Sequence, residues 1–221
     1  RIAYRGILKH PERLDRAVRI GSYLQRPFVD KDSMTRRLPY PLNALARTIS
    51  LPALSHHPLR GRLKDYPSPR TGASPKVALY AGCVANYAYP DLGEDVMKVL
   101  QRYGAEPYYP QGQTCCGAPA WFDGDVETAT SLAKTNIAAL EEVAPDYIVT
   151  VCPGCASMLK QEYLWLTASE PEWNQRAKAM SGKIRDFSPL VLELSPSAEK
   201  KPAQNKKVTY HDPCHLRRGL G

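Results

Sequence analysis

The sequence predicts an α/β protein, built as a Rossmann-like parallel sheet with helices on both faces. From Lys76 onward, short apolar runs alternate with longer segments of helical periodicity. Cysteines follow three of the apolar runs in the spacing C-x31-C-C-x35-C-x2-C, and about thirty residues is the length of one βαβ unit. Because the carboxyl ends of parallel strands meet at one edge of a sheet, we expect the cysteines to converge there.

Composition and charge narrow the class of protein. The chain is 43% hydrophobic and 24% charged, as in ordinary globular proteins. It has neither an apolar run of membrane-spanning length nor a secretory signal. We therefore expect reduced cysteines and a location either free in the cytoplasm or at the inner face of the cell membrane. The net charge of +8 is uneven: residues 1–75 hold 15 Lys and Arg against 5 Asp and Glu, and residues 76–221 hold 15 against 17.

Residues 1–75 are predicted to form a basic helical and linker arm. Proline at the first position and an apolar stripe predict a basic amphipathic helix over residues 11–24. Prolines then recur to residue 75 and leave room for no more than a short helix near residues 42–49. The arm is expected to be solvated or to dock on a partner subunit or an anionic membrane, and to be dispensable for the fold.

Residues 76–200 are predicted to form the first cysteine-rich domain. Cysteine-bearing loops are expected after the first two strands, and the Cys152–Cys155 motif is expected to open the helix after the third. Leu92 is expected to share the core face of the first helix with Val96 and Leu100. A further helix over 172–180 and a short apolar run over 189–194 follow. The expected elements are strands over 77–81, 107–110 and 147–151 and helices over 91–103, 126–143 and 156–164.

Residues 201–221 are predicted to start a second, truncated domain of the same kind. Lys207-Val208 with Cys214 repeats the pattern of Lys76-Val77 with Cys83, each cysteine lying seven residues after its lysine. A linker is expected over residues 195–206. The chain is therefore expected to be an internal fragment of a longer protein.

The residue types at these positions favour a metal cluster. Cys152-Pro153-Gly154-Cys155 lies where a strand ends and a helix begins, and N–H groups at a helix start stabilise thiolates. Zinc is the alternative, although five thiols with an adjacent pair strain a tetrahedral site. A thioredoxin-like redox pair would leave Cys83, Cys115 and Cys116 without a role.

These motifs resemble a known family. Cys83, Cys115-Cys116-Gly117, the Cys152–Cys155 motif and the later His211–His215 run (HDPCH) are similar to the cysteine-rich CCG domain, which occurs twice in one of the subunits of heterodisulfide reductase. The domain is also found in iron–sulfur subunits of glycolate oxidase, lactate-utilisation and anaerobic glycerol-3-phosphate dehydrogenases. The resemblance implies a 4Fe-4S cluster, cubane or non-cubane. Its implied ligands are Cys83, Cys115, Cys116, Cys152 and Cys155, with Cys214 a cofactor ligand of the second module.

The resemblance also implies a function in electron transfer. We expect an iron–sulfur subunit of a multisubunit oxidoreductase that passes electrons from a flavoprotein dehydrogenase of glycolate, lactate or glycerol 3-phosphate toward a quinone or another carrier. Another iron–sulfur subunit or a ferredoxin domain is an expected partner. The alternatives are a catalytic subunit of heterodisulfide reductase type and a zinc-stabilised interaction module. The arm has no nucleic-acid recognition motif, so no nucleic-acid partner is expected.

Overall fold

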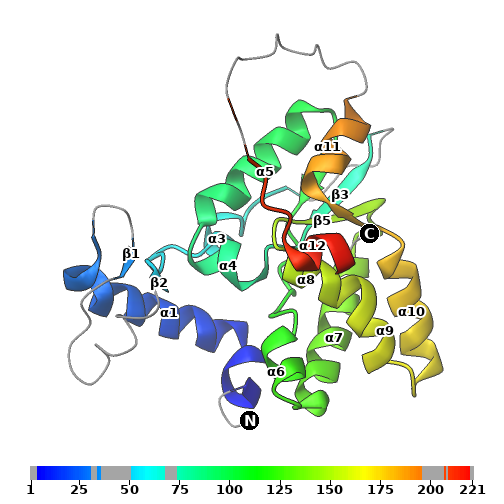
Figure 1. Ribbon diagram of the computed structural model, residues 1–221, viewed down its shortest axis with the longest axis horizontal. Coiled ribbons are helices and arrows are strands. Elements are labelled where there is room, and N and C mark those ends of the chain that lie inside the picture. Colours follow the sequence, from blue (N-terminus) through cyan, green and yellow to red (C-terminus); the bar gives the residue numbers. More distant parts are fainter. Residues whose placement is uncertain are drawn as a thin grey trace.

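Four parallel strands form the central sheet of the domain (Figure 1). The computed structural model describes residues 4–30, 34–35, 51–67, 74–195, 207 and 209–219. The strand order is β4-β3-β5-β6, and every neighbouring pair is parallel. The three predicted strands are confirmed, and the fourth was not predicted. The bounds are β3 (Lys76–Leu79), β4 (Glu106–Tyr108), β5 (Tyr147–Thr150) and β6 (Ile184–Asp186).

Alternate strand residues face two separate apolar cores. Val77 and Leu79 of β3 belong to one core with helices α5 (Pro90–Arg102) and α11 (Phe187–Leu194). Ala78 and Tyr80 belong to the other, which is built with helices on the opposite face. Both faces of the sheet are therefore covered, which confirms the predicted Rossmann-like class. The opposite face carries α7 (Val126–Glu141), α9 (Tyr163–Leu166) and α10 (Pro171–Ser181).

In helix α5 a glycine faces the core where a leucine was expected. Val96 and Leu100 are buried as predicted, but Leu92 is 46% exposed and Gly93 faces the core in its place. A Cβ on Gly93 would lie 2.1 Å from Cδ2 of Leu59. The prediction for Leu92 was wrong because the side chain of Leu59 fills the space above the glycine.

The core reaches back beyond the expected boundary at Lys76. Leu59 and Leu63 are 0% and 6% exposed and pack with β3 and α5. Residues 59–63 therefore pack into the core, which argues against the expectation that the whole arm is dispensable for the fold. The short helix expected near 42–49, the linker over 196–206 and the position of Val208 lie outside the described residues.

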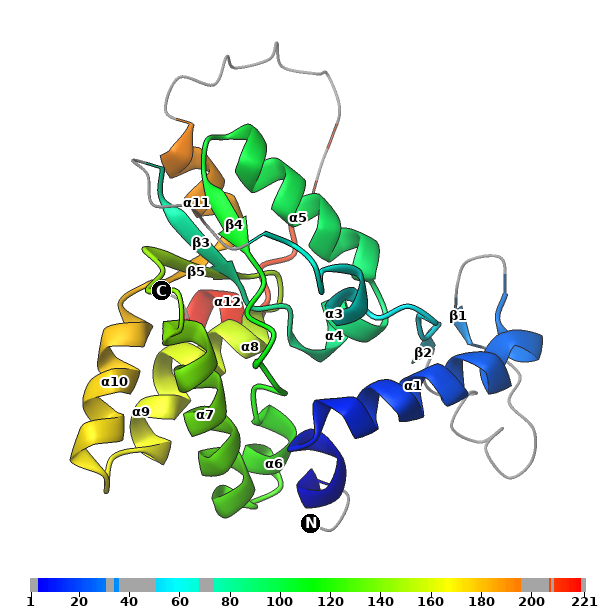
Figure 2. The same ribbon diagram turned by 180° about the vertical axis from the view of Figure 1, so that it is seen from behind.

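Several short elements complete the chain. Two of them, α4 (Gly82–Tyr87) and α6 (Ala118–Phe122), occupy segments expected to be loops. The predicted N-terminal helix is confirmed as α1, which starts near α6 and ends near β1 and β2 (Figure 2). The remaining elements are η1 (Tyr4–Leu8), α1 (Pro11–Gln25), η2 (Arg26–Phe28), β1 (Met34–Thr35), β2 (Leu51–Pro52), α3 (Leu59–Arg62), α8 (Pro153–Ser157), the π-helical turn η3 (Met158–Glu162) and α12 (Cys214–Gly219).

Within the described ranges, none of the helices combines the length and the apolar composition of a membrane span.

Candidate metal centre

Three strand-to-helix connections bring five thiols to the carboxyl edge of the sheet. Cys83 lies in the first turn of α4, after β3, and Cys115 and Cys116 lie just before α6, after β4. Cys152 is the residue before α8, and Cys155 lies in the first turn of that helix. The strand order changes direction around β3, so β3 and β5 flank the switch point where open α/β sheets bind ligands.

The five thiols interact with one another. The sulfur of Cys116 accepts hydrogen bonds from the thiols of Cys115 and Cys155, and Cys155 is also hydrogen bonded to Cys152. Cys83 lies close enough to interact electrostatically with Cys115, Cys116 and Cys152. All five are free thiols. The predicted convergence of the cysteines is thus observed in the described structure.

Burial is graded across the site. Cys116 and Cys155 are each 4% exposed and Cys115 is 7% exposed, whereas Cys152 is half-buried. The side chain of Cys83 reaches the surface, although desolvation by the surrounding loops still raises its pKa. The site therefore has a closed inner side and an open rim at Cys83.

Protons are shared unequally among these thiols. The hydrogen bonds from Cys115 and Cys155 lower the pKa of Cys116 well below that of an ordinary thiol. The same bond, together with burial, raises the pKa of Cys115. Hydrogen bonding to Cys155 lowers the pKa of Cys152 to about 6. Because Cys155 has one S–H proton, that proton is shared between the sulfurs of Cys116 and Cys152, whose pKa values are the two that are lowered.

Backbone N–H groups add further stabilisation to the thiolates. The N–H of Gly117 donates to the sulfur of Cys115, and the N–H of Ala118 donates to that of Cys116. The N–H groups of Gly154 and Cys155 donate to the sulfur of Cys152. Donors of this kind surround the sulfurs of metal–thiolate centres and adjust their potential.

A glycine allows two of the thiol-bearing segments to approach closely. Gly82, directly before Cys83, has a φ of +65°, which only glycine adopts readily. A Cβ at this position would lie 2.7 Å from the sulfur of Cys155. Any larger residue would therefore fill the space beside Cys155 and push the segments after β3 and β5 apart.

The donor set fits a polynuclear cluster better than a single ion. Five thiols exceed the four ligands of tetrahedral zinc. Among the described residues, no group of three or more Cys, His, Asp or Glu side chains has the arrangement of a metal-ion site. Thiolates from three separate segments, with N–H donors around them, are the ligand set that iron–sulfur clusters use.

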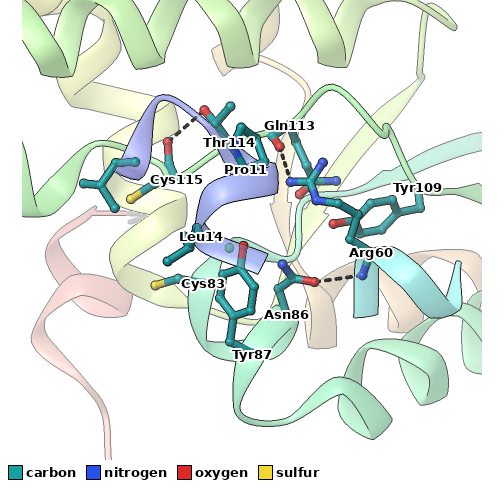
Figure 3. A pocket seen from close by; sticks show the side chains of 12 residues that line it. Pro11, Leu14, Arg60, Cys83, Asn86, Tyr87, Tyr109, Gln113, Thr114 and Cys115 are labelled. Carbon is teal, nitrogen blue, oxygen red and sulfur yellow. Dashed lines mark hydrogen bonds between the residues drawn. The ribbon is translucent and has the colours of Figure 1, made fainter. Parts of the chain in front are cut away.

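Helix α1 covers one side of the site. Leu8, Pro11 and Leu14 line a small cavity that also borders Cys83 and Cys115 (Figure 3). Its volume of about 20 Å³ is enough for a single water molecule. The amino-terminal segment therefore shields the cysteines, a role that its sequence did not predict.

Polar contacts fasten α1 above the site. Oδ1 of Asp15 accepts a 2.7 Å hydrogen bond from the hydroxyl of Tyr87, and its Oδ2 lies 3.7 Å from Nε of Arg60. Arg60 in turn donates to the backbone carbonyls of Gln111 and Gln113 in the loop that leads to Cys115. One partly buried ion pair thus connects α1, α3 and the cysteine loop.

Buried polar residues that the sequence analysis did not single out hold the same loop. Gln113 donates to the carbonyls of Leu79 and Pro110 and accepts from the N–H of Ala81. Asn136 of α7 and Tyr163 of α9 bind the backbone at the Cys-Cys pair. The available signal was an asparagine at a core position of a largely apolar helix face, since buried polar groups are generally hydrogen bonded.

Cys214 lies on a separate element from the five thiols. It begins α12, which lies against α8 (Figure 1). Its side chain is exposed and lines a hollow of about 260 Å³ with Gly154, Ser157 and His215. Its role as a cofactor ligand of a second module stays a prediction.

A group of thiols at the carboxyl edge of a doubly covered parallel sheet defines a cysteine-rich α/β domain. Residues 77–160 match the family model CCG, described as a cysteine-rich domain. This match confirms, for residues 77–160, the resemblance to the CCG family inferred from the motifs.

Relatives with known names share this region. Lactate utilization protein A of Halalkalibacterium halodurans is 35% identical over 146 residues, covering 66% of this chain and 59% of that protein. The probable glycolate oxidase iron-sulfur subunit of Bacillus subtilis is 33% identical over 223 residues, covering 97% and 49%. A subunit of fumarate reductase (CoM/CoB) from Methanothermobacter marburgensis is 35% identical over 146 residues, covering 66% and 27%. The chain thus spans between 27% and 59% of these relatives.

Proposed function

We propose that this chain is part of an iron–sulfur subunit of a multisubunit oxidoreductase and that it holds a cluster through Cys83, Cys115, Cys116, Cys152 and Cys155. The observation that carries the proposal is the convergence of five interacting free thiols at the switch point of the sheet. The names of the glycolate oxidase and fumarate reductase relatives support the same class. A bound cluster would supply one-electron transfer.

The residues of this chain would bind, shield and tune that centre. The thiolates supply the ligands, and the N–H groups at the starts of α6 and α8 stabilise their charge. Leu8, Pro11 and Leu14 limit the access of water on one side. The exposed rim at Cys83 leaves a short route for electrons to and from a partner.

The electron donor we propose is a flavoprotein dehydrogenase subunit acting on a small hydroxy acid, with another iron–sulfur subunit or ferredoxin domain as a further partner. The names of the lactate utilization and glycolate oxidase relatives support this substrate class. Arg13, Arg16 and Arg19 are exposed on α1. These arginines favour docking on an acidic partner surface or at the inner face of the cell membrane. Salt should weaken this docking because it screens the charges.

Metal analysis of anaerobically purified protein tests the proposal. We expect a brown protein with iron and labile sulfide, about four of each per complete site. Cys116→Ser and Cys155→Ser remove the two most buried sulfurs and should abolish assembly, whereas Cys83→Ser at the rim should lower iron content less. Cys214→Ser is the matched control, because its exposed thiol lies on α12, and it should retain the iron of this site.

Two results would contradict the proposal. One is a colourless protein with stoichiometric zinc, which would favour a zinc-stabilised module. The other is unchanged iron content in the Cys116→Ser and Cys155→Ser proteins, which would show that the buried thiols are not ligands.

A further inference from the structure

Three consecutive backbone carbonyls at the Cys-Cys loop are bound by three fully buried side chains. The hydroxyl of Tyr80 donates to the carbonyl of Thr114 at 2.8 Å. Nδ2 of Asn136 donates to the carbonyl of Cys115 at 2.9 Å, and the hydroxyl of Tyr163 donates to that of Cys116 at 3.0 Å. Tyr80, Asn136 and Tyr163 are each 0% exposed. We call these three residues the buried frame.

The bonding of Asn136 fixes the orientation of its amide. Oδ1 accepts from the backbone N–H of Thr114 at 2.7 Å, and Nδ2 donates both to the carbonyl of Cys115 and to the hydroxyl of Tyr163 at 2.9 Å. A reversed amide would place NH₂ against the N–H of Thr114 and lose these bonds. Asn136 and Tyr163 therefore belong to one hydrogen-bond network, in which the amide of Asn136 has a single orientation.

The frame determines where the N–H groups of the loop point. In a planar trans peptide, C=O and N–H face opposite directions. The carbonyl of Cys115 is held toward Asn136, and the N–H of the same peptide, on Cys116, faces the Cys116 sulfur. The carbonyl of Cys116 is held toward Tyr163, and the N–H of that peptide, on Gly117, faces the sulfur of Cys115.

We propose that the buried frame of Tyr80, Asn136 and Tyr163 positions the peptide groups of the Cys115-Cys116 loop and thereby raises the reduction potential of the centre that these thiolates hold. The inference rests on the proposed function. A reduced cluster carries more negative charge on its sulfurs, so N–H groups aimed at the sulfurs stabilise the reduced form. A frame residue touches the backbone and not the cluster, and is therefore a positioning residue.

Tyr163→Phe is the most direct test. It keeps the ring and removes only the hydroxyl that binds the carbonyl of Cys116. The matched control is Tyr108→Phe: Tyr108 is 4% exposed, and its hydroxyl donates to the carbonyl of Leu140 at 3.4 Å, away from the cysteine loop. Each variant loses a buried hydroxyl–carbonyl bond, and Tyr163→Phe also loses the bond that its hydroxyl accepts from Asn136, but only the bonds of Tyr163 orient the cysteine loop.

The readouts are iron and sulfide content, melting temperature and the midpoint potential from a redox titration followed by electron paramagnetic resonance. We expect a more negative midpoint potential for Tyr163→Phe than for the wild type, and a wild-type potential for Tyr108→Phe. The role would also be supported if Tyr163→Phe lost the cluster, Tyr108→Phe retained it, and the two variants had equal melting temperatures. Tyr80→Phe releases the carbonyl of Thr114 and should shift the potential in the same direction if Tyr163→Phe does not fold.

A wild-type potential in both Tyr163→Phe and Tyr80→Phe would overturn the inference, since the frame would then contribute to stability alone. An equal shift in Tyr108→Phe would overturn it as well. Failure of the proposed function is distinguishable, because it would appear as an absence of iron from the wild-type protein itself.

Discussion

The contact between Leu59 of α3 and Gly93 of α5 predicts how substitutions of these two residues change the free energy of unfolding. Leu59 is 0% exposed and lies directly above Gly93. Leu59→Ala removes the three carbon atoms beyond Cβ, which is about 2.4 kcal/mol at about 0.8 kcal/mol for each buried CH₂. Because a glycine has no side chain that could enter the cavity, we expect a total loss of about 3 to 4 kcal/mol in the free energy of unfolding.

Gly93→Ala should destabilise the wild-type protein and stabilise the Leu59→Ala protein. In the wild type the new Cβ would lie 2.1 Å from Cδ2 of Leu59, and Cδ1 and Cγ are also close, at 3.0 and 3.1 Å. Rotation of the leucine therefore cannot relieve the clash, and we expect a net loss of about 1 to 2 kcal/mol. In the Leu59→Ala protein the methyl fills part of the cavity, and the gain of about 1 kcal/mol in helix propensity makes the change stabilising.

Thermal unfolding of the four proteins completes this double-mutant cycle. A change of 1 kcal/mol shifts the melting temperature by about 2 to 4 °C for a chain of this size, so Leu59→Ala should lower it by about 6 to 16 °C. Leu192→Ala is the control, because Leu192 is 71% exposed, and it should change stability by less than about 0.5 kcal/mol. An equal effect of Gly93→Ala in both backgrounds would refute the contact, since contacting residues couple by about 0.5 to 3 kcal/mol.

Three further predictions concern the site and the arm. Gly82→Ala should reduce iron content, because its Cβ would lie 2.7 Å from the sulfur of Cys155; full iron loading would contradict the close approach. The pKa of Cys152 is lowered to about 6, so its alkylation by iodoacetamide in apo-protein should rise through about pH 6, where an ordinary thiol needs about pH 8.5. A rise centred above pH 8 would be the contrary result. Removal of residues 1–75 deletes Leu59 from the core and should lower both melting temperature and iron content, and an unchanged protein would show the arm to be dispensable.

The sequence was sufficient to predict the sheet and the thiol cluster, because both depend on local patterns repeated along the chain. Strands β3, β4 and β5 each carry apolar residues and each precede one cysteine group. Strand β6 was missed because its three residues include Arg185 and Asp186, and only Ile184 is buried. The fourth strand therefore had almost no apolar signal.

Contacts between distant segments were not predictable from periodicity. Leu59 lies in a proline-rich stretch that reads as a linker, yet it fills the space left by Gly93. Asn136 reads as one polar residue in a helix, and its partners at positions 114, 115 and 163 lie 21 to 27 residues away. Such pairings are determined by the three-dimensional packing of the elements, which a one-dimensional pattern does not contain.

The arrangement of the strands has a consequence for the order of events during synthesis of the chain. Strand β3 pairs with β4 on one side and with β5 on the other. A nascent chain that has formed only the β3–β4 pair holds three of the five thiols, and Cys152 and Cys155 join them only after β5 is in place. All five thiols are therefore together only once β5 has paired with β3, and the pairing of β6 at the end of the sheet is not needed for it.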